Sequence, residues 1–384
     1  MWQPAFLELA APRRYPLLFP PAGDDGALLV VGGQVSRAPP CALSPAPRRV
    51  PFLFPRTSCS SPVLSLNLHV SVLALNLHVS VLALNLHVSV LARPARPPEF
   101  PPAGARRAGG RRQGADGGAL QAGGKHLQDT ELVPLGPLLA QDPAPGEAAA
   151  GAGPRLCFKR GGAGSALLPP LALVFGGTDG AKFHTTIEGL LPGAGGWASA
   201  GAWREFHQMD AARFLPLVAP AAGRAWVFGG FDGERILASA RVFTPPQDED
   251  LETEGAYGSW EKLPDMPRAR MAGAAVALGA HILLLGGCSK SKAALASVDV
   301  FDTLTREWLP SGECPPPLPA PRTECAALVA GGRLWVVGGS DAAGWHSDAW
   351  VLALDDKGRW DAWAPAESLS CPVSSAGPLA LVLD

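Results

Sequence analysis

Four stretches of this 384-residue chain align with one another on a pair of adjacent glycines. Each pair ends a short apolar run, and the pairs are Gly176 and Gly177 (LALVFGG), Gly229 and Gly230 (RAWVFGG), Gly286 and Gly287 (HILLLGG), and Gly338 and Gly339 (RLWVVGG). The first glycines stand at 176, 229, 286 and 338, so successive copies are 53, 57 and 52 residues apart. One repeat of this size cannot bury both faces of its strands, so neighbouring copies must stack on each other.

The copy around the third pair shows the content of one repeat most clearly. Two apolar runs, Ala274–Leu278 and His281–Leu285, are separated by a turn at Gly279, and an alternating run, Ser297–Phe301, follows the glycines. This pattern predicts four short strands, with a tryptophan on the last. The tryptophan arrives 22 to 31 residues after the first glycine in every copy, at Trp203, Trp260, Trp308 and Trp360. A large apolar side chain at a fixed place suits the space between stacked sheets.

This pattern resembles the kelch repeat, whose marks are a diglycine after a hydrophobic run and a downstream aromatic residue followed by tryptophan. The tyrosine of the family is replaced here by Phe301 in the best copy and by Phe243 in the copy before it. The resemblance covers about residues 171–384, with an isolated diglycine, Gly32 and Gly33, near the start. It implies an all-β, kelch-type β-propeller of four-stranded blades, with four clear blades, a fifth at the N-terminus and room for a sixth.

The chain divides into three parts on this interpretation. Residues 1–60 form a degenerate N-terminal blade, residues 61–168 a low-complexity insertion that we expect to be disordered, and residues 169–384 the propeller blades. Because a ring of sheets must close or leave an edge exposed, we expect the C-terminal residues 379–383 to dock beside the strand that precedes Gly32.

The insertion contains the sequence LNLHVSVLA three times in tandem, over residues 66–92. Nine residues reverse the facing side on a helix and also on a strand, so neither element buries a consistent face across the copies. We favour a simple duplication. A membrane-spanning helix over 65–92 and a metal site formed by His69, His78 and His87 are the alternatives.

Composition argues against several classes of protein. The net charge of −2 offers no global field for nucleic acid. The seven cysteines are odd in number and contain no CxxC pair, so neither a disulfide framework nor a zinc site is expected. The first residues show no secretory signal pattern. We expect a protein of the cytoplasm, with the nucleus also open, that binds neither nucleic acid nor membrane.

Catalytic patterns are missing from the sequence. We find no phosphate-binding loop, dinucleotide loop, nucleophile elbow or HExxH pattern. Copper oxidases of the galactose oxidase type use a kelch-like fold with tyrosine ligands, but this chain has only Tyr15 and Tyr257. We therefore predict no catalytic, metal-binding or cofactor-binding residue and no cofactor.

The predicted fold nevertheless creates a binding surface. In an up-and-down blade, the loop after each diglycine and the segment leading into each repeat lie at the same end of the sheet. We call this end the loop face, and predict that it binds a partner through Asp179, Lys182, His184, Arg213, Asp232, Glu234, Arg235, Arg270, Lys290, Lys292, Glu324, Asp341, Trp345 and His346. Arg268 and Arg322 are assigned instead a structural role, bonding strand carbonyls between blades.

Mixed charges beside an exposed aromatic residue suit recognition of a protein loop or peptide. The function predicted from the sequence is therefore a non-catalytic protein-interaction scaffold that binds an unidentified partner protein or peptide on the loop face. The alternative is a metal-dependent enzyme, or a modifier of the specifier type, that uses the same face.

Overall fold

The computed structural model describes side chains for residues 128–130, 132, 151–246, 257–291, 293–330, 332–353, 360–366 and 368. Before residue 135 it also places short strands, most of whose side chains are not described. Lys292, Gly32, Gly33, the tandem repeat at 66–92 and the C-terminal residues 379–383 lie outside the described residues.

The clearest repeat folds as its sequence predicts, into the antiparallel sheet β17 (Ala274–Leu278), β18 (His281–Leu285), β19 (Val298–Asp302) and β20 (Glu307–Trp308). Along β18, Ile282 and Leu284 pack toward the preceding sheet while Leu283 and Leu285 pack toward the following one. All four are fully buried. The strand is a continuous apolar run because both of its faces are covered by neighbouring sheets.

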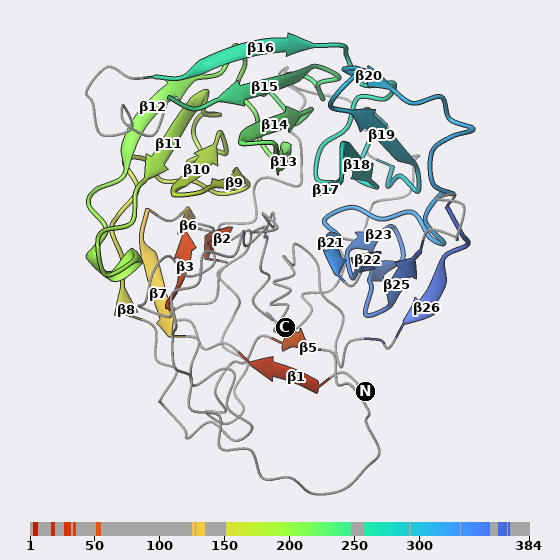
Figure 1. The fold of residues 1–384 in the computed structure, drawn as a ribbon, viewed down its shortest axis with the longest axis horizontal. Helices are drawn as coiled ribbons and strands as arrows, with labels where there is room; N and C mark the ends of the chain where they lie inside the picture. The colour runs from red at the N-terminus through yellow and green to blue at the C-terminus, as the bar shows by residue number, and fades with distance from the viewer. Residues whose placement is uncertain are drawn as a thin grey trace, which may run out of the picture.

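Three more four-stranded sheets come from the other diglycine repeats. In each of them the strands follow chain order from the inside of the ring to the outside (Figure 1). Their members are β9 (Gly164–Leu168), β10 (Leu171–Phe175), β11 (Thr186–Leu190) and β12 (Arg204–Gln208); β13 (Leu217–Ala221), β14 (Arg224–Phe228), β15 (Ala240–Thr244) and β16 (Ser259–Leu263); and β21 (Ala326–Ala330), β22 (Arg333–Val337), β25 (Ala349–Leu352) and β26 (Ala364–Ala366).

The N-terminal part supplies a fifth four-stranded sheet, in the order β2-β3-β7-β8. It combines β2 (Leu17–Phe19) and β3 (Ala27–Val31) with β7 (Thr130–Pro134) and β8 (Gly151–Ala152). Two strands of this blade thus come from the segment predicted to be an insertion, and the whole of β9 also lies before residue 169. Because β3 pairs with β2 on one side and β7 on the other, it has no free edge for the docking predicted for residues 379–383, and that prediction is wrong.

Three short pairs complete the strands. They are β1 (Gln3–Phe6) with β5 (Pro51–Phe54), β4 (Gln34–Val35) with β6 (Lys125–His126), and β23 (Ser340–Asp341) with β24 (Gly344–Trp345). The β1–β5 pair lies between the last blade and the N-terminal blade in Figure 1. A single 3-10 turn, η2 (Trp197–Ser199), is described between β11 and β12.

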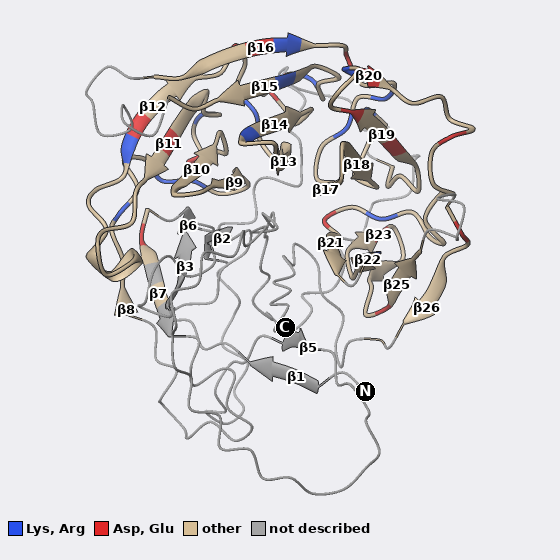
Figure 2. Cartoon of the chain, in the orientation of Figure 1, with Lys and Arg blue, Asp and Glu red and all other residues tan. Residues whose placement is uncertain are grey.

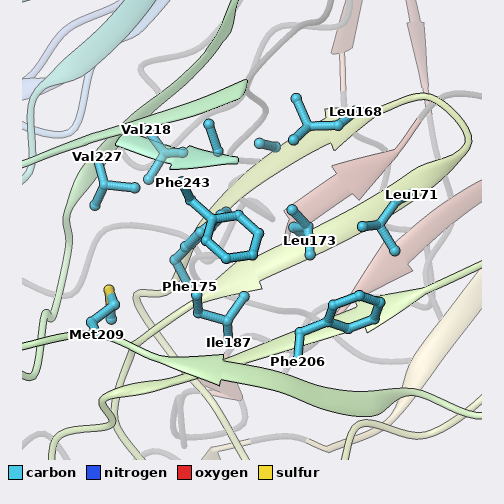
Figure 3. Close-up of a cluster of buried hydrophobic side chains, with 12 residues drawn as sticks. Leu168, Leu171, Leu173, Phe175, Ile187, Phe206, Met209, Val218, Val227 and Phe243 are labelled. Atoms are coloured by element: carbon cyan, nitrogen blue, oxygen red, sulfur yellow. The ribbon is translucent and has the colours of Figure 1, made fainter. Parts of the chain in front are cut away.

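The five sheets are arranged radially, with β2, β9, β13, β17 and β21 nearest the centre (Figure 1). The inner strands carry no charged residue, whereas outer strands such as β12 and β16 do (Figure 2). Between the β9–β12 and β13–β16 blades, Phe175 and Ile187 of one sheet share a cluster with Val218 and Phe243 of the next (Figure 3). Apolar packing between neighbouring sheets therefore holds the ring together, and the predicted propeller is confirmed.

Candidate functional site: the loop face

The diglycines turn the chain at the loop face by adopting left-handed backbone conformations. At Gly229 and Gly230 the φ angles are +57° and +93°, and the other three pairs are alike. A Cβ atom on Gly229 would stand 2.1 Å from the carbonyl oxygen of Arg270 in the next blade. Glycine is required at this place by the backbone angle and by the close approach of the following blade.

One arginine in each segment leading into a repeat is completely buried beneath the loop face. These residues are Arg160, Arg213, Arg270 and Arg322, each 1% exposed or less. Every one donates through Nη1 to the carbonyl oxygen of the first glycine of its own blade, sixteen residues later, over 2.5, 2.7, 2.9 and 2.9 Å. A carboxylate pairs with each guanidinium: Glu188, Asp210, Asp299 and Asp348 respectively.

Three of these arginines, Arg213, Arg270 and Arg322, also join their blade to the one before it. The backbone N–H of Gly230 donates to the carbonyl oxygen of Arg270 over 3.0 Å, and Gly177 and Gly287 do the same to Arg213 and Arg322 over 2.8 and 2.9 Å. The arginine backbone thus holds the preceding diglycine while its side chain holds the following one. This arrangement links consecutive blades at equivalent points around the axis.

Arg213 and Arg270 are therefore wrongly predicted as partner-binding residues. Both are 0% exposed, and their guanidinium groups are occupied by main-chain oxygens and carboxylates of the protein itself. The structural role expected for Arg322 agrees with its bonds to Gly338 and Asp348. Arg268 is half-exposed and contacts Asp299 over 3.2 Å.

The repeated tryptophans lie at the outside of the blades. Trp308 packs on Phe301 with ring centroids 4.9 Å apart, and its Nε1 donates to the carbonyl oxygen of Pro264 in the preceding blade over 3.1 Å. Trp260 packs on Phe243 in the same way at 5.1 Å. Each ring covers the outer edge of the inter-blade cluster.

Each loop after a diglycine is a miniature hairpin that pairs with the segment leading into its blade. Phe231 bridges Phe214 on one side and Ile236 on the other, and the other blades have the equivalent bridges. In the last blade the hairpin is regular enough to form β23 and β24. The loop face is thus built from ordered backbone, from which only the side chains at the hairpin tips project.

An aspartate three residues after the first glycine shapes the hairpin in three of the four blades. Oδ1 of Asp179 accepts the backbone N–H groups of Ala181 and Lys182, both over 2.8 Å. Asp232 and Asp341 hold the equivalent turns. Burial opposes ionisation of Asp179 and Asp232, but the two backbone donors outweigh it and lower the pKa of each carboxyl. Oδ1 of each carboxylate is therefore bonded within its own turn.

Apart from Lys292, the predicted partner-binding residues therefore fall into three groups. Lys182, Glu234, Arg235, Lys290 and Trp345 are exposed at or beside the hairpin tips, with Trp345 43% exposed. Half-buried positions are occupied by Asp179, Asp232, Glu324, Asp341 and His346. The third group, Arg213, Arg270 and His184, is buried.

His184 is also wrongly predicted as a partner-binding residue, because its ring lies buried under the hairpin. It is 3% exposed, contacts the carbonyl oxygen of Lys159 through Nε2 over 3.2 Å, and lies 5.7 Å from the ring of Phe158. Burial, followed by the nearby positive charge of Arg160, lowers its pKa to about 4. The imidazole is neutral at neutral pH and is part of the interior.

Sequence reasoning missed an aromatic cluster between two of the hairpins. Phe183 packs against Phe214 and Phe231, with Leu215 and Met271 nearby. It also missed that Leu215, Ala272 and Glu324 share a left-handed conformation two residues after the buried arginine, with φ of 50°, 55° and 55°. The regular sixteen-residue spacing from arginine to glycine was the signal that could have identified the buried series.

Within the described ranges no group of three or more histidine, cysteine, aspartate or glutamate side chains could hold a metal ion. A search of the same part of the chain found no helix with the length and apolar character needed to cross a membrane.

Comparison with known proteins finds relatives that are named for kelch. No family model matches the sequence. The chain is 34% identical over 146 residues to "Kelch domain-containing protein 8B" of Homo sapiens. This match covers 36% of this chain and 39% of that protein. An F-box/kelch-repeat protein of Arabidopsis thaliana is 32% identical over 116 residues, covering 30% and 27%. Beta-scruin of Limulus polyphemus is 26% identical over 194 residues, covering 48% and 20%.

These matches span less than half the length of each curated relative. A solved structure titled "Structure of YjhT" aligns with 65% of this chain and 80% of its own at 13% identity, with a TM-score of 0.49. The assignment rests on the repeats, on the five sheets they build and on the relatives that are named for kelch. By these features, the fold is a kelch-type β-propeller, and the sequence is similar to proteins named for the kelch repeat.

Proposed function

We propose that this protein is a non-catalytic scaffold that binds a partner protein or peptide on the loop face. The observation that carries the proposal is the contrast between the backbone and the side chains of the hairpins. Bridges and aspartate turns hold the backbone. Lys182, Arg235, Lys290 and Trp345 remain exposed on that frame.

A preorganised surface of this kind favours binding because little conformational entropy is lost when a partner docks. Tryptophan and arginine are also the residues most often responsible for binding energy at protein interfaces. Two relatives are named for a kelch domain or a kelch repeat, which agrees with a repeat that presents loops from stacked blades.

Site-specific photo-crosslinking in cells tests the proposal on the full chain. A photoreactive amino acid replaces Trp345 or Lys290 on the loop face, and in matched controls it replaces Leu304 or Arg224. Leu304 is 80% exposed on the turn between β19 and β20, and Arg224 begins β14, so both lie at the opposite end of their sheets.

We expect discrete adducts with another protein from the loop-face positions and none from the controls. Equal adducts from both ends, or adducts only from Leu304 and Arg224, would place the binding surface elsewhere. A Trp345→Ala variant should weaken adduct formation from Lys290, since the aromatic side chain contributes to the same surface.

A further inference from the structure

The hairpins of two consecutive blades meet on the loop face. Phe183, from the hairpin of the β9–β12 blade, lies 5.4 Å from Phe231 of the β13–β16 blade, ring centroid to ring centroid, in an edge-on arrangement. A Cβ atom at Gly233, at the tip of the second hairpin, would come within 3.0 Å of the Phe183 ring. The two tips therefore form one continuous surface, which we call the Phe183 boundary.

A basic side chain stands at the same place in each of these hairpins. Lys182 follows Gly176 by six residues, and Arg235 follows Gly229 by six. Both are exposed; the Arg235 side chain is 77% exposed, and Nζ of Lys182 lies 5.6 Å from the centre of the Phe158 ring. The Phe183 boundary consequently has two half-buried aromatic rings, Phe183 and Phe231, in its centre and a cation contributed by each blade.

Unlike the basic side chains, the aspartate carboxylates of the same two hairpins are half-buried and bonded to the backbone. Oδ1 of Asp179 and of Asp232 each accepts two backbone N–H groups, and both carboxylates are half-buried. Oδ2 of Asp232 lies 3.5 Å from Nε of Arg235. Among the described residues of the two hairpins, Glu234 is the carboxylate that is exposed.

We infer that the Phe183 boundary binds a peptide segment in which an apolar side chain is flanked by carboxylates. The apolar side chain would rest on Phe183 and Phe231, while the carboxylates pair with Lys182 and Arg235. This inference deepens the proposed function and rests on it. A nucleic acid is the other anionic ligand to be tested, and the net charge of −2 offers no global attraction for its many phosphates.

The test uses the full-length protein and three fluorescein-labelled peptides: Glu-Glu-Leu-Glu-Glu, Gln-Gln-Leu-Gln-Gln and Glu-Glu-Ala-Glu-Glu. Fluorescence anisotropy should show binding of the first peptide that weakens with added salt, and weaker binding of the other two. A labelled oligouridine serves as the nucleic-acid probe. The double variant Lys182→Glu/Arg235→Glu should lower the affinity for the first peptide about tenfold or more, since two attractive pairs become repulsive.

The matched control is Arg224→Glu/Arg333→Glu. It makes the same change of charge at the first residues of β14 and β22, at the opposite end of the sheets, and should leave the affinity unchanged. Glu234→Gln should tighten binding, because it removes the exposed like charge. If charge reversal unfolds the chain, Lys182→Gln/Arg235→Gln replaces it and should still weaken binding.

The inference is overturned if the glutamine peptide binds as well as the glutamate peptide, if the two double variants behave alike, or if the oligouridine binds in preference. These results leave the proposed function standing when loop-face photo-crosslinks persist. Loss of those crosslinks overturns the proposed function as well, so the two failures are distinguishable.

Discussion

The guanidinium group of Arg270 donates to the carbonyl oxygen of Gly286 across 2.9 Å, in the interior between two blades. The backbone carbonyl of the same arginine accepts the N–H group of Gly230 from the preceding blade. One residue therefore fixes the position of two diglycines, and Arg213 and Arg322 do the same in their blades. The loop face is rigid because this buried series supports it from below.

Removal of the Arg270 side chain should strongly destabilise the protein. Arg270→Ala leaves the Asp299 carboxylate and the Gly286 carbonyl without their buried partner, which typically costs about 3–5 kcal/mol of the free energy of unfolding. Urea unfolding followed by tryptophan fluorescence measures the change. Arg268→Ala is the matched control, because that half-exposed side chain pairs with the same aspartate, and it should cost about 1 kcal/mol or less. Similar losses from the two variants would contradict the role assigned to Arg270.

A methyl group at Gly229 should also be poorly tolerated. Gly229→Ala combines a φ of +57° with a Cβ atom 2.1 Å from the Arg270 carbonyl oxygen, so the neighbouring blade must move. We expect a loss of more than about 2 kcal/mol in the free energy of unfolding. The control Gly223→Ala has a φ of +69° but nothing within 4 Å of the new atom, and should cost only about 1 kcal/mol. Equal losses would mean that the close contact between blades is not formed.

Stability should depend on pH through His184. Its folded pKa of about 4 lies below its ordinary value of 6.5, so the unfolded chain binds more protons between these two values. Stability attributable to His184 is therefore complete above pH 6.5 and is lost as the pH falls toward 4, by up to roughly 1.4 kcal/mol per pH unit. The lowered pKa of Asp179 adds a further loss at more acidic pH.

The pH prediction is checked by urea unfolding at several values from pH 4.5 to pH 7.5, roughly the range over which His184 titrates in the unfolded chain. His184→Gln should show a shallower dependence than the unchanged protein over this range. Gly223→Ala, which alters no titrating group, should retain the original dependence. An unchanged slope in His184→Gln would show that the imidazole is not buried in its neutral form.

The blades were predictable from the sequence because their strands are short apolar runs bounded by glycine turns. Ala274–Leu278 and His281–Leu285 became β17 and β18 with the same bounds. The fourth strand of the N-terminal blade was not predictable in this way, since Gly151–Ala152 has no apolar alternation. A neighbouring strand, and not its own sequence, determines that pairing.

The sequence predicts at which end of the sheets the candidate site residues lie, but not whether each side chain is buried or exposed. Counting residues from the diglycine locates Lys182, Arg235 and Arg270 at the same end of the sheets. Whether a charged side chain at that end points outward or inward depends on the carbonyl groups and carboxylates that other segments bring to it. Arg270 meets Gly286 and Asp299 in the interior, whereas Arg235 stands at an open hairpin tip.

Amide hydrogen exchange at Gly177, Gly230 and Gly287 tests most directly that consecutive blades are joined through the diglycines. Each of these N–H groups donates to the arginine carbonyl of the following blade. The structure predicts that all three exchange slowly, with the protection of amides in the inner strands. Exchange at the rate of an unstructured peptide at these glycines, in a protein whose strand amides are protected, would contradict the account.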